Sequence, residues 1–230
     1  MDFFAFSNRQ ACESALLDDV SARLSETLQG SNQVSIALAG GNTPKDFYSQ
    51  LSEVEIPWQK VKVSLTDERW VDVEHPDSNE RMIKQTLLQN EAKSCLFFGL
   101  KNSEITPMAG QLRTADLLNK AVKKIDYAIL GMGDDGHFAS IFPNMENTEQ
   151  LLDLNQTAPC LPACPEGKPA RMSLTLSYLL RAKCLYVFVC GEAKRSVIEN
   201  MQQPNPETIL PIYYLIHQDE CPVKFYWSES

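Results

Sequence analysis

Residues 34–44 read Val-Ser-Ile-Ala-Leu-Ala-Gly-Gly-Asn-Thr-Pro, a short apolar run followed by two glycines and a helix-start signal. The apolar run Val34–Leu38 predicts a buried strand. Thr43 is expected to cap a helix, because its hydroxyl can accept a hydrogen bond from a free N–H, and Pro44 suits the first helical position. The stretch therefore predicts a strand, a glycine turn and a helix in succession.

The same alternation extends along the rest of the chain. Leucines and a valine recur every four residues in Arg9–Gln29, which predicts a helix with one apolar stripe that ends near Gly30. Further strands are expected at Val61–Leu65, Tyr127–Leu130, Leu185–Val189 and Val223–Trp227, and further helices at Asn79–Leu88, Pro107–Asn119 and Gly191–Met201. Strands separated by helices predict a Rossmann-like α/β fold, with a mainly parallel central sheet and helices on both faces.

A single domain spanning residues 1–230 is expected from the length and from the absence of an internal repeat. Hydrophobic residues make up 43% and charged residues 22%, which is ordinary for a globular protein with a core. Pro143–Pro169 contains five of the thirteen prolines and little periodicity. Because strands resume after it, this segment predicts a long surface loop beside a cleft and not a linker.

The charge and the cysteines limit the partners. A net charge of −9 disfavours nucleic acid, although a few donors inside a cleft can still attract a small anion. No apolar run approaches the roughly 20 residues that cross a bilayer, and no basic and apolar leader opens the chain, so we expect no membrane contact and a cytoplasmic location. The seven scattered cysteines predict reduced thiols. We expect no metal, no cofactor, and a monomer or a small homo-oligomer.

Four polar or glycine-rich clusters each begin where an expected strand stops. They are Gly40-Gly41, Asp67–Arg69, Gly131–His137 and Gly191–Lys194. In parallel sheets, ligands bind beyond the carboxyl ends of the strands. The four clusters therefore predict one site at one rim of the sheet.

Glycines ahead of a helix let backbone N–H groups surround a phosphate, and Asn42 and Thr43 add side-chain donors. The alternative is a tight turn that needs glycine only for its shape. Neither a dinucleotide fingerprint nor a phosphate loop ending in Gly-Lys-Ser/Thr is present, so nucleotide binding has no support. In Asp67–Arg69, Arg69 can reach a carbonyl or phosphate oxygen while a carboxylate holds it. The alternative there is a solvated salt-bridged rim.

Residues 131–143, Gly-Met-Gly-Asp-Asp-Gly-His-Phe-Ala-Ser-Ile-Phe-Pro, are the most informative stretch. Imidazole titrates near neutrality, so His137 can take a proton from water, while Asp135, or alternatively Asp134, fixes the ring tautomer. Ser140 lies nearby, but the chain has no Gly-x-Ser-x-Gly elbow, so an acyl-enzyme route lacks its usual geometry. The stretch favours direct attack by water.

Taken together, six segments resemble the 6-phosphogluconolactonase family, in the family's order and over nearly the whole chain. They are Ala39–Pro44, Thr66–Arg69, Ser78-Asn79, Gly131–Pro143, Arg171–Thr175 and Gly191–Lys194. The resemblance implies a fold like that of glucosamine-6-phosphate deaminase. It also implies a hydrolase that opens 6-phospho-D-glucono-1,5-lactone to 6-phosphogluconate in the oxidative pentose phosphate pathway.

The resemblance also implies roles for matching residues. His137 would be the general base, Asp135 its partner, and Arg69 with Asp67 would lie beside the reacting lactone. The expected phosphate-binding residues are Gly40, Gly41, Asn42, Thr43, Arg171 and Lys194. In the mechanism we expect, the base deprotonates a water that attacks the ester carbonyl, while an arginine or backbone N–H groups stabilise the oxyanion.

Two rival functions remain. An amino-sugar phosphate isomerase or deaminase typically has Asp-Glu-Tyr and an Asn-Glu pair in the related segments, whereas this chain has Arg69 in place of the tyrosine and Ser-Ile-Phe-Pro at residues 140–143. A non-catalytic sugar-phosphate-binding protein would keep the phosphate loop and lose the base. Because His137, Asp135 and Arg69 are all present, the sequence favours an enzyme.

Overall fold

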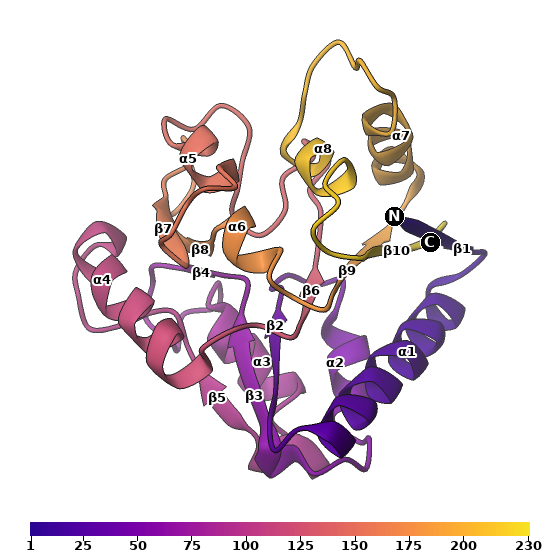
Figure 1. Ribbon diagram of the computed structural model, residues 1–230, viewed down its shortest axis with the longest axis vertical. Helices are drawn as coiled ribbons and strands as arrows, with labels where there is room; N and C mark the ends of the chain where they lie inside the picture. The colour runs from indigo at the N-terminus through magenta and orange to yellow at the C-terminus, as the bar shows by residue number, and fades with distance from the viewer.

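The computed structural model describes residues 1–230, and a seven-stranded parallel sheet organises them (Figure 1). The strand order is β1-β10-β9-β6-β2-β3-β5. The strands are β1 (Asp2–Phe6), β2 (Val34–Leu38), β3 (Val61–Leu65), β5 (Leu96–Phe98), β6 (Tyr127–Leu130), β9 (Cys184–Cys190) and β10 (Val223–Ser228). Every residue of β2 and β6 is buried, which confirms the buried strands expected from their apolar runs. The first and last strands pair, so both termini lie at one edge of the sheet.

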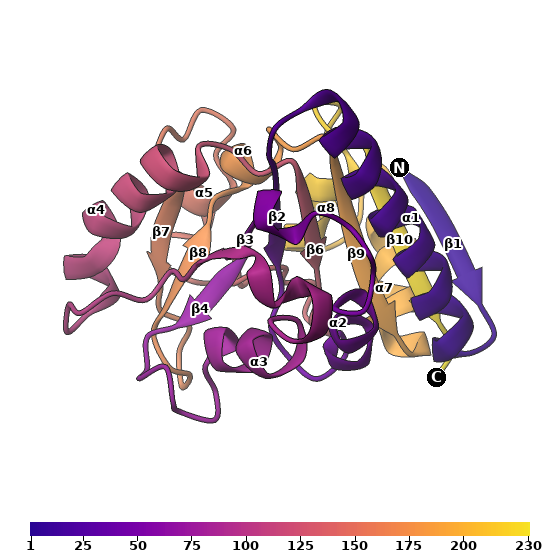
Figure 2. The same ribbon diagram turned by 90° about the horizontal axis from the view of Figure 1, so that it is seen from below.

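Helices cover both faces of this sheet. They are α1 (Arg9–Gly30), α2 (Lys45–Leu51), α3 (Asn79–Thr86), α4 (Pro107–Leu117), α5 (Thr148–Leu152), α6 (Leu176–Leu179), α7 (Glu192–Met201) and α8 (Pro211–Ile216). In Figure 2, α1 and α2 pass in front of the strands and α8 lies behind them. The predicted α/β class with a parallel central sheet is confirmed. None of the helices has the length and apolar composition that spanning a bilayer requires.

The strand order reverses between β2 and β6. From β2 the chain proceeds to β3 and β5 on one side, and it then returns to β6 on the other side. Leu38 pairs with Ile129 at the ends of the two strands, and the Ala39 N–H donates to the Ile129 carbonyl at 2.9 Å. The loops that follow β2 and β6 therefore diverge at a topological switch point, where α/β proteins place their ligands.

A second sheet of three antiparallel strands lies beside the first. Its order is β4-β8-β7, formed by β4 (Asp67–Arg69), β8 (Arg171–Leu174) and β7 (Cys160–Ala163). Thr66 alone separates β3 from β4 and joins both sheets. Its N–H donates to the Leu38 carbonyl at 3.0 Å, and its carbonyl accepts from the Leu174 N–H at 2.9 Å. The charged cluster that we expected to follow a strand is thus itself a strand.

Some local expectations were wrong. Pro143–Pro169 is not only a surface loop, because it contains α5 and β7 and buries Leu151 and Cys160 completely. These elements are too short to produce a detectable period. The strands β1 and β5, at residues 2–6 and 96–98, were not predicted either.

The start of α2 also differs from the prediction. The helix begins at Lys45, so Pro44 occupies the N-cap position instead of the first helical position. No side chain caps this helix, and the expected Thr43 cap was therefore wrong. The Thr43 carbonyl instead accepts a hydrogen bond from Arg9 Nη2 at 2.7 Å, which ties the glycine turn to α1.

Candidate active site

A cavity of about 200 Å³ opens at the carboxyl ends of β2 and β6. It is lined by most of the predicted site residues, namely Gly40, Gly41, Thr43, Asp67, Arg69, His137, Arg171 and Lys194. Asn42 is exposed and does not line the cavity, and Asp135 reaches it only through His137. The four strand-end clusters thus contribute to one site, as the strand-end argument predicts.

His137 is oriented by a carboxylate in its own loop. Its Nδ1 shares a short hydrogen bond with Asp135 Oδ1, and its backbone N–H donates to the same oxygen at 3.2 Å. Asp134, the alternative orienting residue, makes no hydrogen bond to the ring. With Nδ1 engaged, Nε2 has no protein partner. Because one ring nitrogen is bound to a carboxylate, the other can act on a proton in the cavity.

Glycine and an aromatic ring fix the plane of this imidazole. A Cβ atom at Gly133 would lie 2.2 Å from ring atoms of His137, so only glycine leaves room for the ring. The Phe142 ring stacks on the imidazole, with 4.0 Å between the ring centroids. At the outer end of the turn, Gly136 has a φ of 72°, and its carbonyl accepts from the Ile212 N–H at 2.9 Å. The loop is therefore docked on α8 as well as on β6.

The local environment sets the protonation states of His137 and Asp135. Burial lowers the pKa of His137 by more than the hydrogen bond and charge of Asp135 raise it, so the net pKa lies below the ordinary imidazole value. Burial raises the pKa of Asp135, but the hydrogen bond and charge of His137 outweigh burial and lower it overall. At neutral pH the pair is a carboxylate beside a neutral imidazole, the state that a general base requires.

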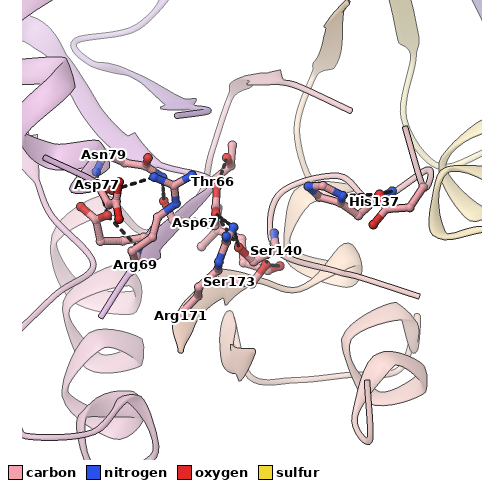
Figure 3. Close-up of polar contacts among 12 residues, drawn as sticks. Thr66, Asp67, Arg69, Asp77, Asn79, His137, Ser140, Arg171 and Ser173 are labelled. Atoms are coloured by element: carbon pink, nitrogen blue, oxygen red, sulfur yellow. Dashed lines mark hydrogen bonds and ion pairs between the residues drawn. The ribbon is translucent and has the colours of Figure 1, made fainter. Parts of the chain in front are cut away.

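The three-stranded sheet supplies a polar group on the other side of the cavity (Figure 3). Asp67 is buried and accepts from Ser140 Oγ at 2.5 Å and from Thr66 Oγ1 at 3.3 Å. Its main-chain carbonyl accepts from Asn79 Nδ2 at 2.8 Å. Arg171 Nη1 lies 3.8 Å from Asp67 Oδ2, too far for a direct hydrogen bond. The carboxylate is thus held by hydroxyls more closely than by the nearest arginine.

Three basic side chains face the cavity. Arg69 donates from Nη1 to the Asp77 carbonyl at 2.6 Å, whereas the buried Nε atoms of Arg69 and Arg171 have no partner. Burial lowers the pKa of Arg171 more than the charge of Asp67 raises it, but a guanidinium remains protonated in proteins. Lys194, in the first turn of α7, makes no ion pair or hydrogen bond. Partly unsatisfied cations around one cavity favour an anionic ligand.

The glycine turn after β2 is held tightly. A Cβ atom at Gly40 would lie 1.8 Å from Asn79 Oδ1, and Gly41 has a φ of 94° that favours glycine. The shape of the turn alone therefore accounts for the two glycines, which is the alternative to phosphate binding that the sequence left open. The turn still presents its backbone to the cavity, so both interpretations are compatible with the structure.

Sequence reasoning did not assign three residues that build this site. Asn79 lies beneath the glycine turn, and Phe142 lies against the imidazole. Ser140 is fully buried and donates to Asp67 and not to His137, so it is not placed as a nucleophile. Ser78 caps α3, so a serine directly ahead of the expected helix is a local signal that could have indicated the position of Asn79. No local pattern indicates a hydrogen bond between side chains as distant in sequence as those of Asp67 and Ser140.

Comparison with known proteins identifies the family of the chain. The model of the family described as glucosamine-6-phosphate isomerases/6-phosphogluconolactonase matches residues 7–227. A 6-phosphogluconolactonase of Pseudomonas putida is 37% identical over 93% of this chain and 87% of its own length. One of Rhizobium meliloti strain 1021 is 34% identical over 97% of each chain. The crystal structure of a 6-phosphogluconolactonase from Shewanella baltica OS155 superposes with a TM-score of 0.94, at 33% identity over 99% of this chain and 97% of that one. The chain therefore belongs to the family of glucosamine-6-phosphate isomerases and 6-phosphogluconolactonases.

Proposed function

We propose that this protein is a 6-phosphogluconolactonase, which hydrolyses 6-phospho-D-glucono-1,5-lactone to 6-phosphogluconate in the cytosolic pentose phosphate pathway. The observation that carries the proposal is the sharing of one cavity by a carboxylate-bound neutral imidazole and three basic side chains. The family membership supports it, since relatives at 33 to 37% identity are named 6-phosphogluconolactonases. Such a cavity can bind a phosphorylated ester and activate water beside it.

The reaction needs one proton carrier. Nε2 of His137 takes a proton from water as the water oxygen bonds to the lactone carbonyl carbon, and Asp135 stabilises the imidazolium that forms. The carbonyl oxygen becomes an oxyanion, which Arg69 or backbone N–H groups stabilise. The bond from that carbon to the ring oxygen then breaks, and the imidazolium returns its proton to the ring oxygen. The product is an open-chain acid that ionises to a carboxylate.

The phosphate supplies the anchoring energy. Lys194 and Arg171 present charge to the cavity, and the turn at Gly40 and Gly41 presents backbone. Thr43, which lines the same cavity, adds a hydroxyl. Holding the phosphate at one end fixes the ester carbonyl relative to His137, and positioning of this kind contributes much of an enzymatic rate. Because lactones of this type open spontaneously, one general base contributing about 10² to 10⁴ in rate is sufficient.

The family also contains isomerases that act on amino-sugar phosphates, so their activity is the second candidate. Arg69 and the Ser-Ile-Phe-Pro sequence at residues 140–143 do not provide the additional acid and base groups that ring opening and deamination need. Ser140 is buried in a hydrogen-bond network and does not replace them. The cavity therefore lacks groups that the isomerase reaction needs, and the lactonase reaction does not need them.

The proposal is tested by comparing two substrates. Proton release is measured on the phosphorylated lactone and on glucono-1,5-lactone without phosphate, with the spontaneous opening of each subtracted. Loss of the charge-assisted contacts predicts kcat/KM lower by about tenfold to hundredfold without the phosphate. Equal kcat/KM values would mean that the phosphate does not contribute to substrate recognition. Ammonia release from glucosamine 6-phosphate would instead favour the isomerase, and binding of 6-phosphogluconate without lactone turnover would favour a non-catalytic protein.

A further inference from the structure

Ser140 joins the loop of the imidazole to the three-stranded sheet. It follows His137 by three residues, yet its side chain points to Asp67 and Arg171 (Figure 3). Its hydroxyl donates to Asp67 Oδ2 at 2.5 Å and accepts from Arg171 Nη1 at 3.3 Å. Its backbone N–H donates to Ser173 Oγ at 3.2 Å. One fully buried residue thus connects β4, β8 and the loop after β6.

The hydroxyl lies between two opposite charges that form an ion pair without a direct hydrogen bond. Arg171 Nη1 and Asp67 Oδ2 are 3.8 Å apart, whereas charge-assisted N–H···O bonds are about 2.7 to 2.9 Å long. Both side chains are nearly buried, with exposed fractions of 11% and 7%. Two buried charges of opposite sign normally pair directly, because that contact repays part of their desolvation. The bridging hydroxyl therefore holds apart a pair that would otherwise close.

The separation leaves donors of Arg171 unused. Its Nε is buried without a partner, although unsatisfied buried donors are uncommon in proteins. The guanidinium also lines the cavity, so an anion there can take the donors that Asp67 does not. Direct pairing would place the guanidinium fork on the carboxylate and remove its donors from the cavity. The position of the Ser140 hydroxyl thus determines whether Arg171 donates to the Asp67 carboxylate or to a ligand.

We propose that Ser140 is a positioning residue that keeps Arg171 apart from Asp67 and so reserves the guanidinium for an anionic group of the substrate. The inference rests on the proposed function, because it assumes a phosphorylated substrate in this cavity. The same residue fixes the anion-binding arginine relative to His137, since only two residues of one loop separate the bridge from the base. Removal of the hydroxyl should let Arg171 close onto Asp67 and weaken substrate binding with little effect on the chemical step.

A matched variant separates this role from simple packing. Ser64 in β3 is also fully buried and its hydroxyl donates to the Phe98 carbonyl at 2.8 Å, but it makes no hydrogen bond to the bridge and does not line the cavity. Ser140→Ala and Ser64→Ala therefore each remove one buried, hydrogen-bonded hydroxyl. If the bridge acts only through stability, both variants will change affinity alike. If it positions Arg171, only Ser140→Ala will lose affinity.

The test measures the Kd of 6-phosphogluconate by calorimetry, and KM and kcat with the phosphorylated lactone, for the wild type and both variants. We expect Ser140→Ala to raise Kd and KM about tenfold, as loss of a hydrogen bond to a charged group does, with kcat within about threefold. Ser64→Ala should keep the wild-type Kd. An unchanged Kd in folded Ser140→Ala, or an equal rise in Ser64→Ala, would overturn the proposal.

Two further measurements keep the result decisive. If Ser140→Ala does not fold, Ser140→Cys takes its place, since a thiol is a weaker donor of similar size, and a wild-type Kd in that variant contradicts the proposal. In Arg171→Lys, which lacks the fork, adding Ser140→Ala should raise Kd no further; an additional tenfold rise would contradict the bridge. If the wild type binds 6-phosphogluconate but does not hydrolyse the lactone, only the proposed function is contradicted. The role of Ser140 is still tested, because it is judged from Kd values and not from turnover.

Discussion

The seven-stranded sheet presents its site residues from loops that follow buried strands, whereas the three-stranded sheet presents them from the strands themselves. His137 comes seven residues after the last residue of β6, in a loop that Gly133 and Gly136 shape. Asp67 and Arg171 are residues of β4 and β8, on neighbouring antiparallel strands. Packing and a carboxylate of its own loop thus fix the imidazole, while hydrogen bonds from a segment far away in the sequence fix the charged pair.

The two sides of the cavity therefore carry groups with different chemical roles. The side that belongs to the large sheet carries a group that exchanges protons near neutral pH. The side that belongs to the small sheet carries guanidinium groups, which stay protonated and act by charge and hydrogen bonding. Substitution of His137 should therefore lower kcat, and substitution of Arg171 should raise KM. A fall in kcat on substitution of Arg171, or a rise in KM on substitution of His137, would show that the two residues share both tasks.

The largest effect is expected for His137→Ala. Loss of a general base lowers kcat by about 10² to 10⁴, while the Kd of 6-phosphogluconate should stay within about threefold because no phosphate contact is assigned to this ring. Single-turnover rates and calorimetry measure the two quantities. His217→Ala is the control, since that imidazole bonds the Met201 carbonyl at 2.8 Å outside the cavity and should leave kcat normal. A near-normal kcat in His137→Ala would refute the assignment of the base.

A smaller effect, on KM instead of kcat, is expected for Arg171→Lys. An ammonium keeps the charge but cannot present two parallel donors, so KM should rise about tenfold while kcat stays within about threefold. Initial rates over a range of lactone concentrations give both constants. Arg181→Lys, at an exposed arginine outside the cavity, should leave both unchanged. A fall in kcat at constant KM would instead place Arg171 at the reacting carbonyl and break the division between the sheets.

The same contrast explains what the sequence could predict. Val34–Leu38 and Tyr127–Leu130 are uninterrupted apolar runs, and such runs indicate buried parallel strands without knowledge of their neighbours. Asp67–Arg69 is three charged residues long and becomes a strand only by pairing with Arg171–Ser173, far along the chain. Local propensity carries no signal for a pairing of that kind. The large sheet was therefore predictable, and the small sheet was not.

The site follows the same rule. His137 and the turn at Gly40 and Gly41 could be predicted from their places at strand ends, before any resemblance was considered. Arg171 entered only through the resemblance, because nothing near it in sequence marks a binding residue. Asn42 was expected in the cavity and is exposed, since membership of a loop does not determine where a side chain points. The bridge made by Ser140 depends on three segments at once and lies beyond any local pattern.

The smallest expected effect is a displacement of the pH profile of kcat/KM, and it tests only His137 and its partner Asp135. A base works when deprotonated, so activity is lost as the pH falls through the pKa of His137, which burial holds below its ordinary value of 6.5. Asp135 raises that pKa, so Asp135→Asn should move the acid limb of kcat/KM to still lower pH, and Asp134→Asn, at an exposed carboxylate, should leave it in place. The substrate phosphate also titrates, near pH 6, but it does so equally for every variant, and the difference between limbs therefore isolates the imidazole. A limb that moves to higher pH in Asp135→Asn would mean that the carboxylate does not support the charged imidazole, and the mechanism would then need another partner for the ring.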